Sequence, residues 1–364
     1  MALEPSLEPS LPGAGEAGFP PAPAGVSAEG RGPWSLAFRR LLRNRVALAF
    51  GALFVLIVAF VLAAPLWAND VAHTGPNATH TTEKISVDGE RREVVNLEGV
   101  PIGPVYLGAD GKFFLGADGG LGRDEMVRLM YGGRTSLFVG IVAALITTVL
   151  ATLLGLIAGY YRGWADAVIS RSMDVIWAFP VLLLGIALGT ALAVGGLKIG
   201  PLSLSSGSIW IPILIIGFVY VPYMGRAVRG EVLALREKEF VEAAVAQGAG
   251  PLRVMFGELL PNLSTTIIVF FTLNIANSML LEAGLSFLGA GVQPPNSSWG
   301  TMLAEGFEQI TSAPQLAIIP GTMILLTVLA ANVFGDGVRD ALDPKSKVRL
   351  EARAGKVEPE GTAV

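Results

Sequence analysis

Six long apolar runs, separated by polar segments, dominate the pattern of this chain. Each approaches the roughly 20 residues with which an α-helix crosses the hydrocarbon core of a membrane. The fourth run is shorter and contains Pro212 and Pro222, which a helix bundle accommodates because neighbouring groups satisfy the freed backbone atoms. The pattern predicts an all-α membrane protein with six transmembrane helices, at residues 46–67, 137–160, 175–194, 209–224, 263–284 and 316–335.

The Lys and Arg residues between the runs indicate how these helices are oriented. Cytoplasmic loops carry an excess of both residues, and here they gather before the first run and after the second, fourth and sixth. The two short segments on the other side contain only Lys198. We therefore expect both termini to be cytoplasmic. The first run is longer than the apolar core of a signal peptide and is preceded by a long lead, so we expect an uncleaved anchor.

The polar segments suggest how the rest of the chain is organised. Residues 1–33 are rich in Pro, Gly, Ala and Glu and predict a disordered cytoplasmic tail. A cytoplasmic segment and the first helix follow at 34–67, then a small extracytoplasmic insertion at 68–130, a membrane domain at 131–340 and a second cytoplasmic tail at 341–364. Apolar and polar residues alternate on both sides of Asp88-Gly89 in the insertion, which predicts a β-hairpin there.

Composition supports the membrane assignment and excludes several kinds of chemistry. The chain is 52% hydrophobic and 15% charged, whereas soluble domains are about 25% charged. Its net charge of −4 gives no reason to expect a nucleic-acid partner. Cysteine is absent, which excludes thiolate chemistry, and His73 and His80 are expected to be surface residues rather than metal ligands. The phosphate-loop, H-E-x-x-H and G-x-S-x-G motifs are also absent. We expect neither a catalytic residue nor a bound cofactor or metal.

The polar loop at residues 225–262 interrupts the apolar pattern. A short helix is predicted from Glu239 to Gln247, because the segment contains several alanines and no helix breaker. Gly248 suits its C-terminus, where a positive φ is often required. Gly250 and Pro251 mark a break, and a second short helix at 252–260 would lead to membrane re-entry at Pro261. Such a helix–turn–helix on the cytoplasmic face could bind another protein or be a solvated amphipathic loop. The candidate contact residues are Glu239, Glu242, Ala243, Ala244, Gly248, Leu260 and Pro261.

Polar residues inside the fifth apolar run are the remaining candidates. Asn274, Asn277 and Ser278 are spaced to share one helix face, which can line an aqueous path or bond a neighbouring helix. Glu282 lies toward the outer end of the same run. A carboxylate in a membrane is costly unless it is paired or hydrated, so we expect Glu282 to be wet or paired at an outer gate. We favour a structural pair there over direct substrate binding.

Several motifs resemble one family of transport proteins. Glu242-Ala243-Ala244, then Gly248 and Leu260-Pro261, resemble the EAA loop of permease subunits of ABC importers, although Glu258 stands where that loop commonly has an apolar residue. The segments at 121–124, 128–136, 159–166, 282–295 and 335–344 are similar to permeases of dipeptide, oligopeptide and nickel importers. An N-terminal anchor followed by a long outer segment is typical of the C-type permease of the pair. The resemblance covers roughly residues 34–345.

This resemblance implies partners and a mechanism. The loop would contain a coupling helix that sits in a groove of an ATPase subunit, and residues 131–340 would form the permease domain. A homologous permease would complete the path, and two ABC ATPases would bind ATP and magnesium. An extracytoplasmic binding protein would deliver di- or oligopeptides through a bacterial-type inner membrane. Nickel complexes or sugars are alternative solutes. A self-sufficient secondary transporter and a membrane scaffold are the alternatives outside this class.

Overall fold

The computed structural model describes residues 33–87, 89–106, 111–199 and 202–342. The predicted tails at 1–33 and 341–364 therefore lie almost entirely outside the described residues. Helices form most of the described chain, and two small hairpins are its sheets. Four helices are long and apolar enough to cross a membrane, or up to six if each of two bent pairs counts as one span. An all-α membrane protein is thus supported, with a count of four to six spans.

The N-terminal part forms one arm of the bundle. It comprises α1 (Pro33–Arg43), α2 (Arg45–Leu62), α3 (Ala64–Leu66) and the π-helical turn η1 (Trp67–Val71). The side chain of Asn44 caps α2 by accepting a hydrogen bond from the Ala47 amide at 3.1 Å, which is a favoured arrangement at a helix start. The segment from α2 to η1 is continuous enough to form the first candidate span, Arg45–Val71. It packs mainly against α13 (Gln315–Leu342).

The insertion contains the predicted hairpin. Strands β1 (Lys84–Val87) and β2 (Glu90–Glu93) are antiparallel, and Val87 pairs with Glu90. Asp88 lies outside the described residues, while Gly89 has a φ of 83°, as a tight hairpin turn requires. A small apolar cluster that includes Val94, Phe113 and Ala117 stabilises this region. The hairpin prediction is confirmed.

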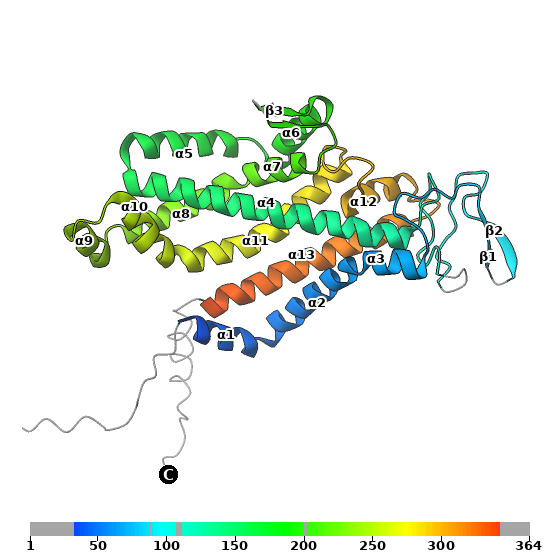
Figure 1. The fold of residues 1–364 in the computed structure, drawn as a ribbon, viewed down its shortest axis with the longest axis horizontal. Coiled ribbons are helices and arrows are strands. Elements are labelled where there is room, and N and C mark those ends of the chain that lie inside the picture. Colours follow the sequence, from blue (N-terminus) through cyan, green and yellow to red (C-terminus); the bar gives the residue numbers. More distant parts are fainter. Residues whose placement is uncertain (1–32, 88, 107–110, 200–201, 343–364) are drawn as a thin grey trace, which may run out of the picture.

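Helix α4 (Glu125–Tyr161) runs along the centre of the bundle (Figure 1). Its 37 residues make it longer than the predicted run at 137–160, and it includes the last residues of the predicted insertion. Asp124 caps its start by accepting from the Val127 amide at 3.0 Å. α4 packs against α7 (Trp210–Val219), α8 (Val221–Leu235) and α11 (Leu260–Phe287). This central helix connects the insertion with the opposite end of the molecule.

The predicted third and fourth helices are bent rather than straight. The run at 175–194 includes the end of α5 (Gly163–Trp177) and most of α6 (Val181–Gly195), which meet at 87°. Pro180 disfavours the helical conformation of the residue before it, which explains the break. Hairpin β3 (Leu197–Ile199) and β4 (Leu202–Leu204) follows. The fourth run is α7 and the first turn of α8, which meet at 41° beside Pro222.

The polar loop also differs from its prediction in one respect. The first short helix is present as α9 (Glu239–Ala246), but the second is not separate. Residues of α10 (Pro251–Arg253), the π-helical η2 (Val254–Leu259) and α11 form one continuous 37-residue helix. Pro261 lacks an amide hydrogen, and the wider π turn directly before it keeps the helix continuous at that position. The prediction of a separate short helix at 252–260 was wrong, because these residues begin the long helix.

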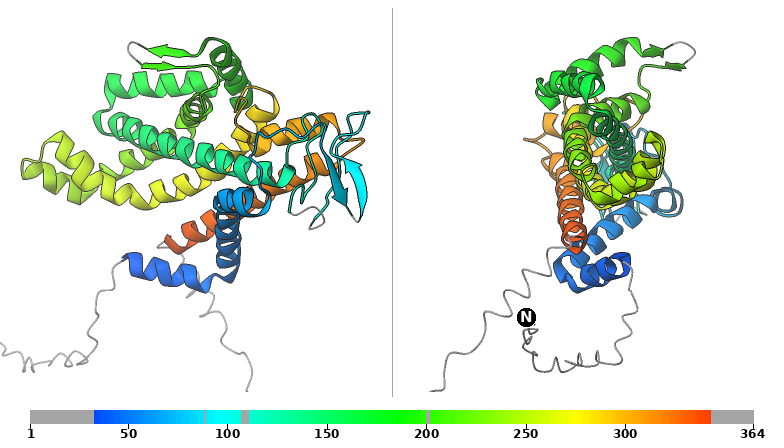
Figure 2. Two further views of the ribbon diagram at one scale, coloured as in Figure 1. Left: turned by 45° about the vertical axis from the view of Figure 1, so that its right-hand side comes forward. Right: turned by 90° about the vertical axis from the view of Figure 1, so that its left-hand side faces the viewer.

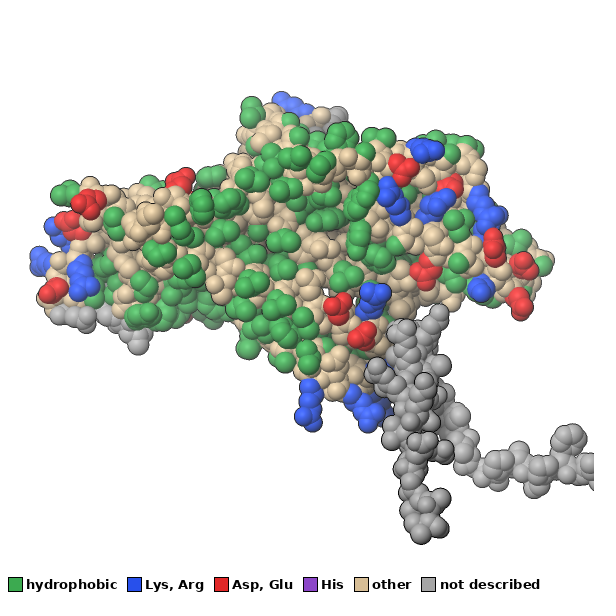
Figure 3. Space-filling model, turned by 180° about the vertical axis from the view of Figure 1, so that it is seen from behind, with side chains coloured by type: hydrophobic (Ala, Val, Ile, Leu, Met, Phe, Trp, Pro, Cys, Tyr) green, Lys and Arg blue, Asp and Glu red, His purple; other side chains and the backbone are tan. Residues whose placement is uncertain are grey.

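The last two helices close the bundle. α12 (Trp299–Glu308) starts with a reciprocal capping box between Ser298 and Thr301, and α13 packs against α2, α11 and α12. The left view of Figure 2 shows the same arrangement, with α9 and the β1–β2 hairpin at opposite ends. On the face shown in Figure 3, hydrophobic side chains cover most of the middle, and charged side chains gather at the two ends and along the lower edge. This distribution suits a protein whose middle lies in lipid.

Candidate functional site

The predicted contact segment lies at one end of the molecule, on α9 and the turn that follows it (Figure 1). Val241 is the buried residue of α9 and belongs to a cluster with Val232, Val254 and Leu259. This contact holds α9 against the ends of α8 and η2. Val241 was not a predicted contact residue. Of those that were, Glu239, Glu242 and Ala243 are exposed on α9, and Ala244 is half-buried. The structure therefore attaches α9 through one apolar residue and presents most of its surface outward.

Gly248 sets the turn after α9. Its φ is +87°, a conformation that L-amino acids with side chains rarely adopt. Its amide donates to the Val245 carbonyl at 2.9 Å, and the Ala249 amide donates to the Ala244 carbonyl at 3.0 Å. A side chain at Gly248 would meet no atom within 4 Å. The requirement for glycine is therefore conformational rather than steric.

Apolar side chains surround this turn. Leu252 is 66% exposed, Val245 51% and Phe256 48%, so the turn carries an apolar surface at an otherwise charged end. Exposed apolar groups of this kind, rimmed by polar residues, commonly mark interaction sites. Leu260 packs partly against the buried cluster, whereas Pro261 is exposed. Most of the predicted contact residues thus lie on the outer surface, whereas Leu260 packs against the buried cluster beneath it.

The predicted polar row on α11 lies inside the bundle. Asn274 and Ser278 are buried, and Asn277 is half-buried. The Asn274 amide nitrogen lies 3.7 Å from the Met224 sulfur, whereas its carbonyl oxygen and the Ser278 hydroxyl have no hydrogen-bond partner among the described residues. The Tyr220 hydroxyl donates to the backbone carbonyl of Asn277 at 3.3 Å. Two buried polar groups on α11 therefore have hydrogen-bonding capacity that the described residues do not use.

Glu282 is buried rather than wet. Its side chain is 0% exposed, and Oε1 accepts a hydrogen bond from the Ser286 hydroxyl at 2.7 Å. Ser136 and Ser298 also lie near the carboxyl group, although Oε2 has no regular hydrogen bond. Within the described chain, no cation pairs with Glu282. The two expected environments were water or a paired partner, and the structure shows a buried group whose contacts are serines of α11, α4 and the α12 cap.

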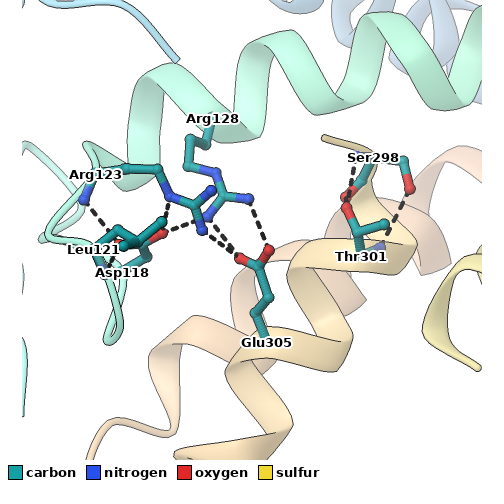
Figure 4. A network of polar contacts seen from close by, with 7 residues as sticks. All are labelled: Asp118, Leu121, Arg123, Arg128, Ser298, Thr301 and Glu305. Atoms are coloured by element: carbon teal, nitrogen blue, oxygen red, sulfur yellow. Dashed lines mark hydrogen bonds and ion pairs between the residues drawn. The ribbon is translucent and has the colours of Figure 1, made fainter. Parts of the chain in front are cut away.

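A charged network at the insertion end was missed by sequence reasoning (Figure 4). The Arg128 Nη1 atom lies 2.5 Å from Asp118 Oδ2 and 2.6 Å from Glu305 Oε2. Arg123 contacts both of the same carboxylates. The network joins the segment before α4, the first turn of α4 and α12. Its only sequence signal was the charge density of residues 118–128, because Glu305 is distant along the chain.

Ion pairs also connect α5 with α8. Arg229 binds Asp166 through two nitrogens, with Nε–Oδ1 and Nη2–Oδ2 distances of 2.5 and 2.6 Å. Arg226 donates to Asp174 at 2.8 Å. These contacts explain how α5 is held beside α8 despite the sharp bend that follows it. The bidentate geometry of Arg229 fixes direction as well as distance.

His80 has structural contacts within the insertion. His80 bonds to Thr74 Oγ1 at 2.9 Å and to Glu83 Oε2 at 2.5 Å. Among the residues with described positions, no cluster of His, Asp and Glu could hold a metal ion. The structure therefore provides a packing role for His80 within the insertion.

Comparisons with known proteins agree with the motifs. Residues 151–348 match the family described as binding-protein-dependent transport system inner membrane component, and residues 32–82 match the N-terminal TM domain of oligopeptide transport permease C. The glutathione transport system permease protein GsiD of Pectobacterium atrosepticum is 37% identical, over 87% of this chain and 93% of its own length. The dipeptide transport system permease protein DppC of Alkalihalophilus pseudofirmus is 38% identical, over 86% and 91%.

The inward-facing MetNI methionine ABC transporter matches 59% of this chain and 96% of its own, with 18% sequence identity and a TM-score of 0.47. The family matches and the curated relatives, rather than this likeness, carry the assignment. The relatives are transport permeases, which confirms the prediction of a transport subunit rather than an enzyme. The chain belongs to the family of binding-protein-dependent transport system inner membrane components.

Proposed function

We propose that this chain is the C-type permease subunit of an ATP-driven importer of short peptides. It would line the path together with a homologous permease, and an extracytoplasmic binding protein would deliver the solute. Two ABC ATPase subunits, which bind ATP and magnesium, would attach at the α9 end. Curated relatives named for glutathione and dipeptide transport support a peptide-like solute. The lack of a phosphate-loop motif in the sequence fits an energy source on separate subunits.

The exposed turn at Gly248 is the observation that carries this proposal. An exposed helix attached through Val241 and flanked by Leu252 and Phe256 can transmit the movement of a bound partner to η2 and α11. ATP binding on that partner would favour one of two permease conformations, because a ligand shifts an equilibrium only through differential binding to its states. The continuous helix Pro251–Phe287 extends from this turn to the polar row of α11 and to Glu282. Coupling and path would therefore share one helix.

The test changes the turn while leaving its surroundings intact. Gly248→Val should lose most solute uptake and stimulated ATPase activity in the assembled importer, because a β-branched residue strongly disfavours a φ of +87°. Gly248→Asn should retain activity, since asparagine tolerates this region of backbone conformation. Gly250→Val is the matched control. Gly250 has a φ of −73° and open space around its Cα, so the same side chain is accommodated there.

Reconstituted uptake and ATPase assays, with the amount of assembled complex measured in parallel, would give the result. Wild-type uptake by Gly248→Val, or equal losses in Gly248→Val and Gly250→Val, would contradict the coupling role. Purification from gently solubilised membranes should also recover a second permease and two ATPases. Uptake by the purified chain alone, driven by an ion gradient, would instead indicate a secondary transporter.

A further inference from the structure

A cavity of about 210 Å³ lies at the insertion end of the molecule. It is enclosed by the segment before α4, the first turn of α4, α12 and the start of α13. This end is opposite α9 (Figure 1), so the cavity is separate from the proposed coupling surface. The polar row of α11 does not line it.

Two buried oxygen atoms in the cavity wall lack hydrogen-bond partners. Glu125 is 2% exposed, and its Oε1 accepts no hydrogen bond from the described residues. Gln309 Oε1 likewise accepts no hydrogen bond from the described residues, although Gln309 Nε2 donates to the Gly99 carbonyl at 3.5 Å. Both atoms are acceptors, and buried acceptors without donors are strongly unfavourable. Arg128 Nε, a buried donor without a partner, belongs to a residue outside the cavity wall. The wall therefore presents two acceptors that a donor entering the cavity would satisfy.

The charges around the cavity specify the sign of that molecule. Arg123 and Arg128 are both paired with Asp118 and Glu305, so these four groups neutralise one another (Figure 4). Glu125 and Glu308 also line the cavity, and neither forms an ion pair within the described chain. Two carboxyl groups, one buried and one exposed, thus line the cavity without a direct ion pair. A buried carboxylate is unfavourable unless a counter-charge accompanies it.

The backbone holds the Gln309 amide in place. A Cβ at Gly119 would lie 1.8 Å from Gln309 Oε1, so the amide packs directly on the backbone there. The neighbouring Gly120 also lines the cavity, but a Cβ at that position would meet nothing within 4 Å. Gly119 and Gly120 both have backbone conformations open to alanine. The two glycines therefore provide a matched pair of substitution sites. An alanine at Gly119 would displace the Gln309 side chain, whereas an alanine at Gly120 would leave it in place.

We propose that this cavity binds a primary ammonium group, with Glu125 as its counter-charge and Gln309 as a second acceptor. An ammonium ion presents three donors and one positive charge in a compact group, which matches the two free oxygens and the excess of carboxyl groups. A metal ion is less suitable, because the described residues contain no metal-binding cluster. The group could be the amino terminus of a transported peptide or a lysine of a docked protein. Only the identity of this source rests on the proposed function; the binding chemistry does not.

The test uses the full-length permease in lipid nanodiscs and two small cations. Calorimetric titration should detect saturable binding of ethylammonium and none of tetramethylammonium, which has the same charge but no N–H donor. Glu125→Gln should weaken ethylammonium binding about tenfold or more, because removal of one member of a buried charge pair is costly. Gly119→Ala should weaken binding by displacing Gln309, whereas Gly120→Ala should bind as the wild type does.

Exposed Glu308 provides a variant that leaves the packed core untouched. Glu308→Gln should weaken ethylammonium binding by a smaller factor and keeps the test valid if Glu125→Gln fails to fold. Equal binding of both cations, no saturable binding, or unchanged binding in correctly folded Glu125→Gln or Glu308→Gln would overturn the proposal.

Competition against ethylammonium distinguishes the two sources. Displacement by dialanine but not by N-acetyl-lysine methylamide would assign the site to peptide amino termini, and the reverse would assign it to a lysine side chain. Displacement by neither would overturn a site for biological ammonium groups. These titrations contain no ATPase, so they can fail while the Gly248 experiments succeed, and the reverse also holds.

Discussion

At the residue scale, Trp299 shows how one side chain joins distant helices. Its indole is 0% exposed and packs with Val61 of α2, Leu129 of α4 and Met302 of α12. The indole nitrogen donates to the Leu129 carbonyl at 2.8 Å. The ring lies so close to α4 that a Cβ at Gly133 would be 2.5 Å from Trp299 Cζ2. Shape and hydrogen bonding therefore act together at this junction.

Replacement of this indole should be costly. Trp299→Phe removes the donor, leaves the Leu129 carbonyl unsatisfied and reduces the packed volume. We expect the free energy of unfolding in detergent to fall by about 1–3 kcal/mol. Trp164→Phe is the control, since Trp164 is 81% exposed and surface substitutions usually change stability by about 0.5 kcal/mol or less. Similar losses in both variants would contradict a specific role for the buried donor.

At the element scale, α4 and α8 approach closely through small residues. Gly155 and Gly159 are four positions apart on α4, and Cβ atoms there would lie 2.8 and 2.7 Å from the Cβ atoms of Val228 and Val232. Small residues at this spacing allow membrane helices to pack closely. The spacing is visible in the sequence, but the sequence does not show that α8, rather than lipid or another subunit, covers this face.

A matched pair of alanine substitutions tests this contact. Gly159→Ala should lower the unfolding free energy by about 1–3 kcal/mol, because an added methyl group forces the packed helices apart. Gly230→Ala on α8 should be neutral or stabilising, since its Cβ would meet nothing within 4 Å and alanine favours a helix over glycine. Thermal unfolding in lipid nanodiscs would provide the comparison. A stable Gly159→Ala variant would show that the contact can relax.

At the scale of the whole molecule, a small polar cluster connects separate segments within the insertion. Glu83 contacts Lys112 at 3.2 Å and His80 at 2.5 Å. Burial opposes ionisation, but the hydrogen bonds from Lys112 and His80 outweigh it and lower the pKa of Glu83 below its ordinary value of 4.5. The Glu83 backbone carbonyl also accepts from the Val94 amide at 3.0 Å. The cluster therefore lies at the base of the β1–β2 hairpin.

The direction of this pKa shift gives a pH prediction. A carboxyl group with a lowered pKa stabilises the fold above its unfolded value, and that contribution is lost as the pH falls through the folded value. Hydrogen-exchange protection of residues 84–93 should therefore decrease below about pH 4.5 in the wild type. In Glu83→Gln, protection should be lower at neutral pH and should depend less on acid. Burial raises the pKa of nearby Asp124 despite backbone hydrogen bonds, and both proteins share that group. An identical acid response in both would refute the role of Glu83.

The sequence by itself determined the features that depend on local pattern. Apolar length identified a membrane protein, alternation around Gly89 identified the hairpin, and the helix ending at Gly248 followed from the need for a positive φ. The EAA-like spacing identified the family that the comparisons later showed. Each of these depends on residues that are neighbours along the chain, so no knowledge of distant contacts was required.

Only the tertiary structure decided which distant groups meet. It bent α5 and α6 by 87°, joined α10 to α11 in one helix, and buried Glu282 beside serines from separate elements. It also brought Glu305 to Arg128, 177 positions away, and so created the charged network beside the cavity. Such arrangements depend on how whole helices pack, because packing determines which polar groups lose water and which partners replace it.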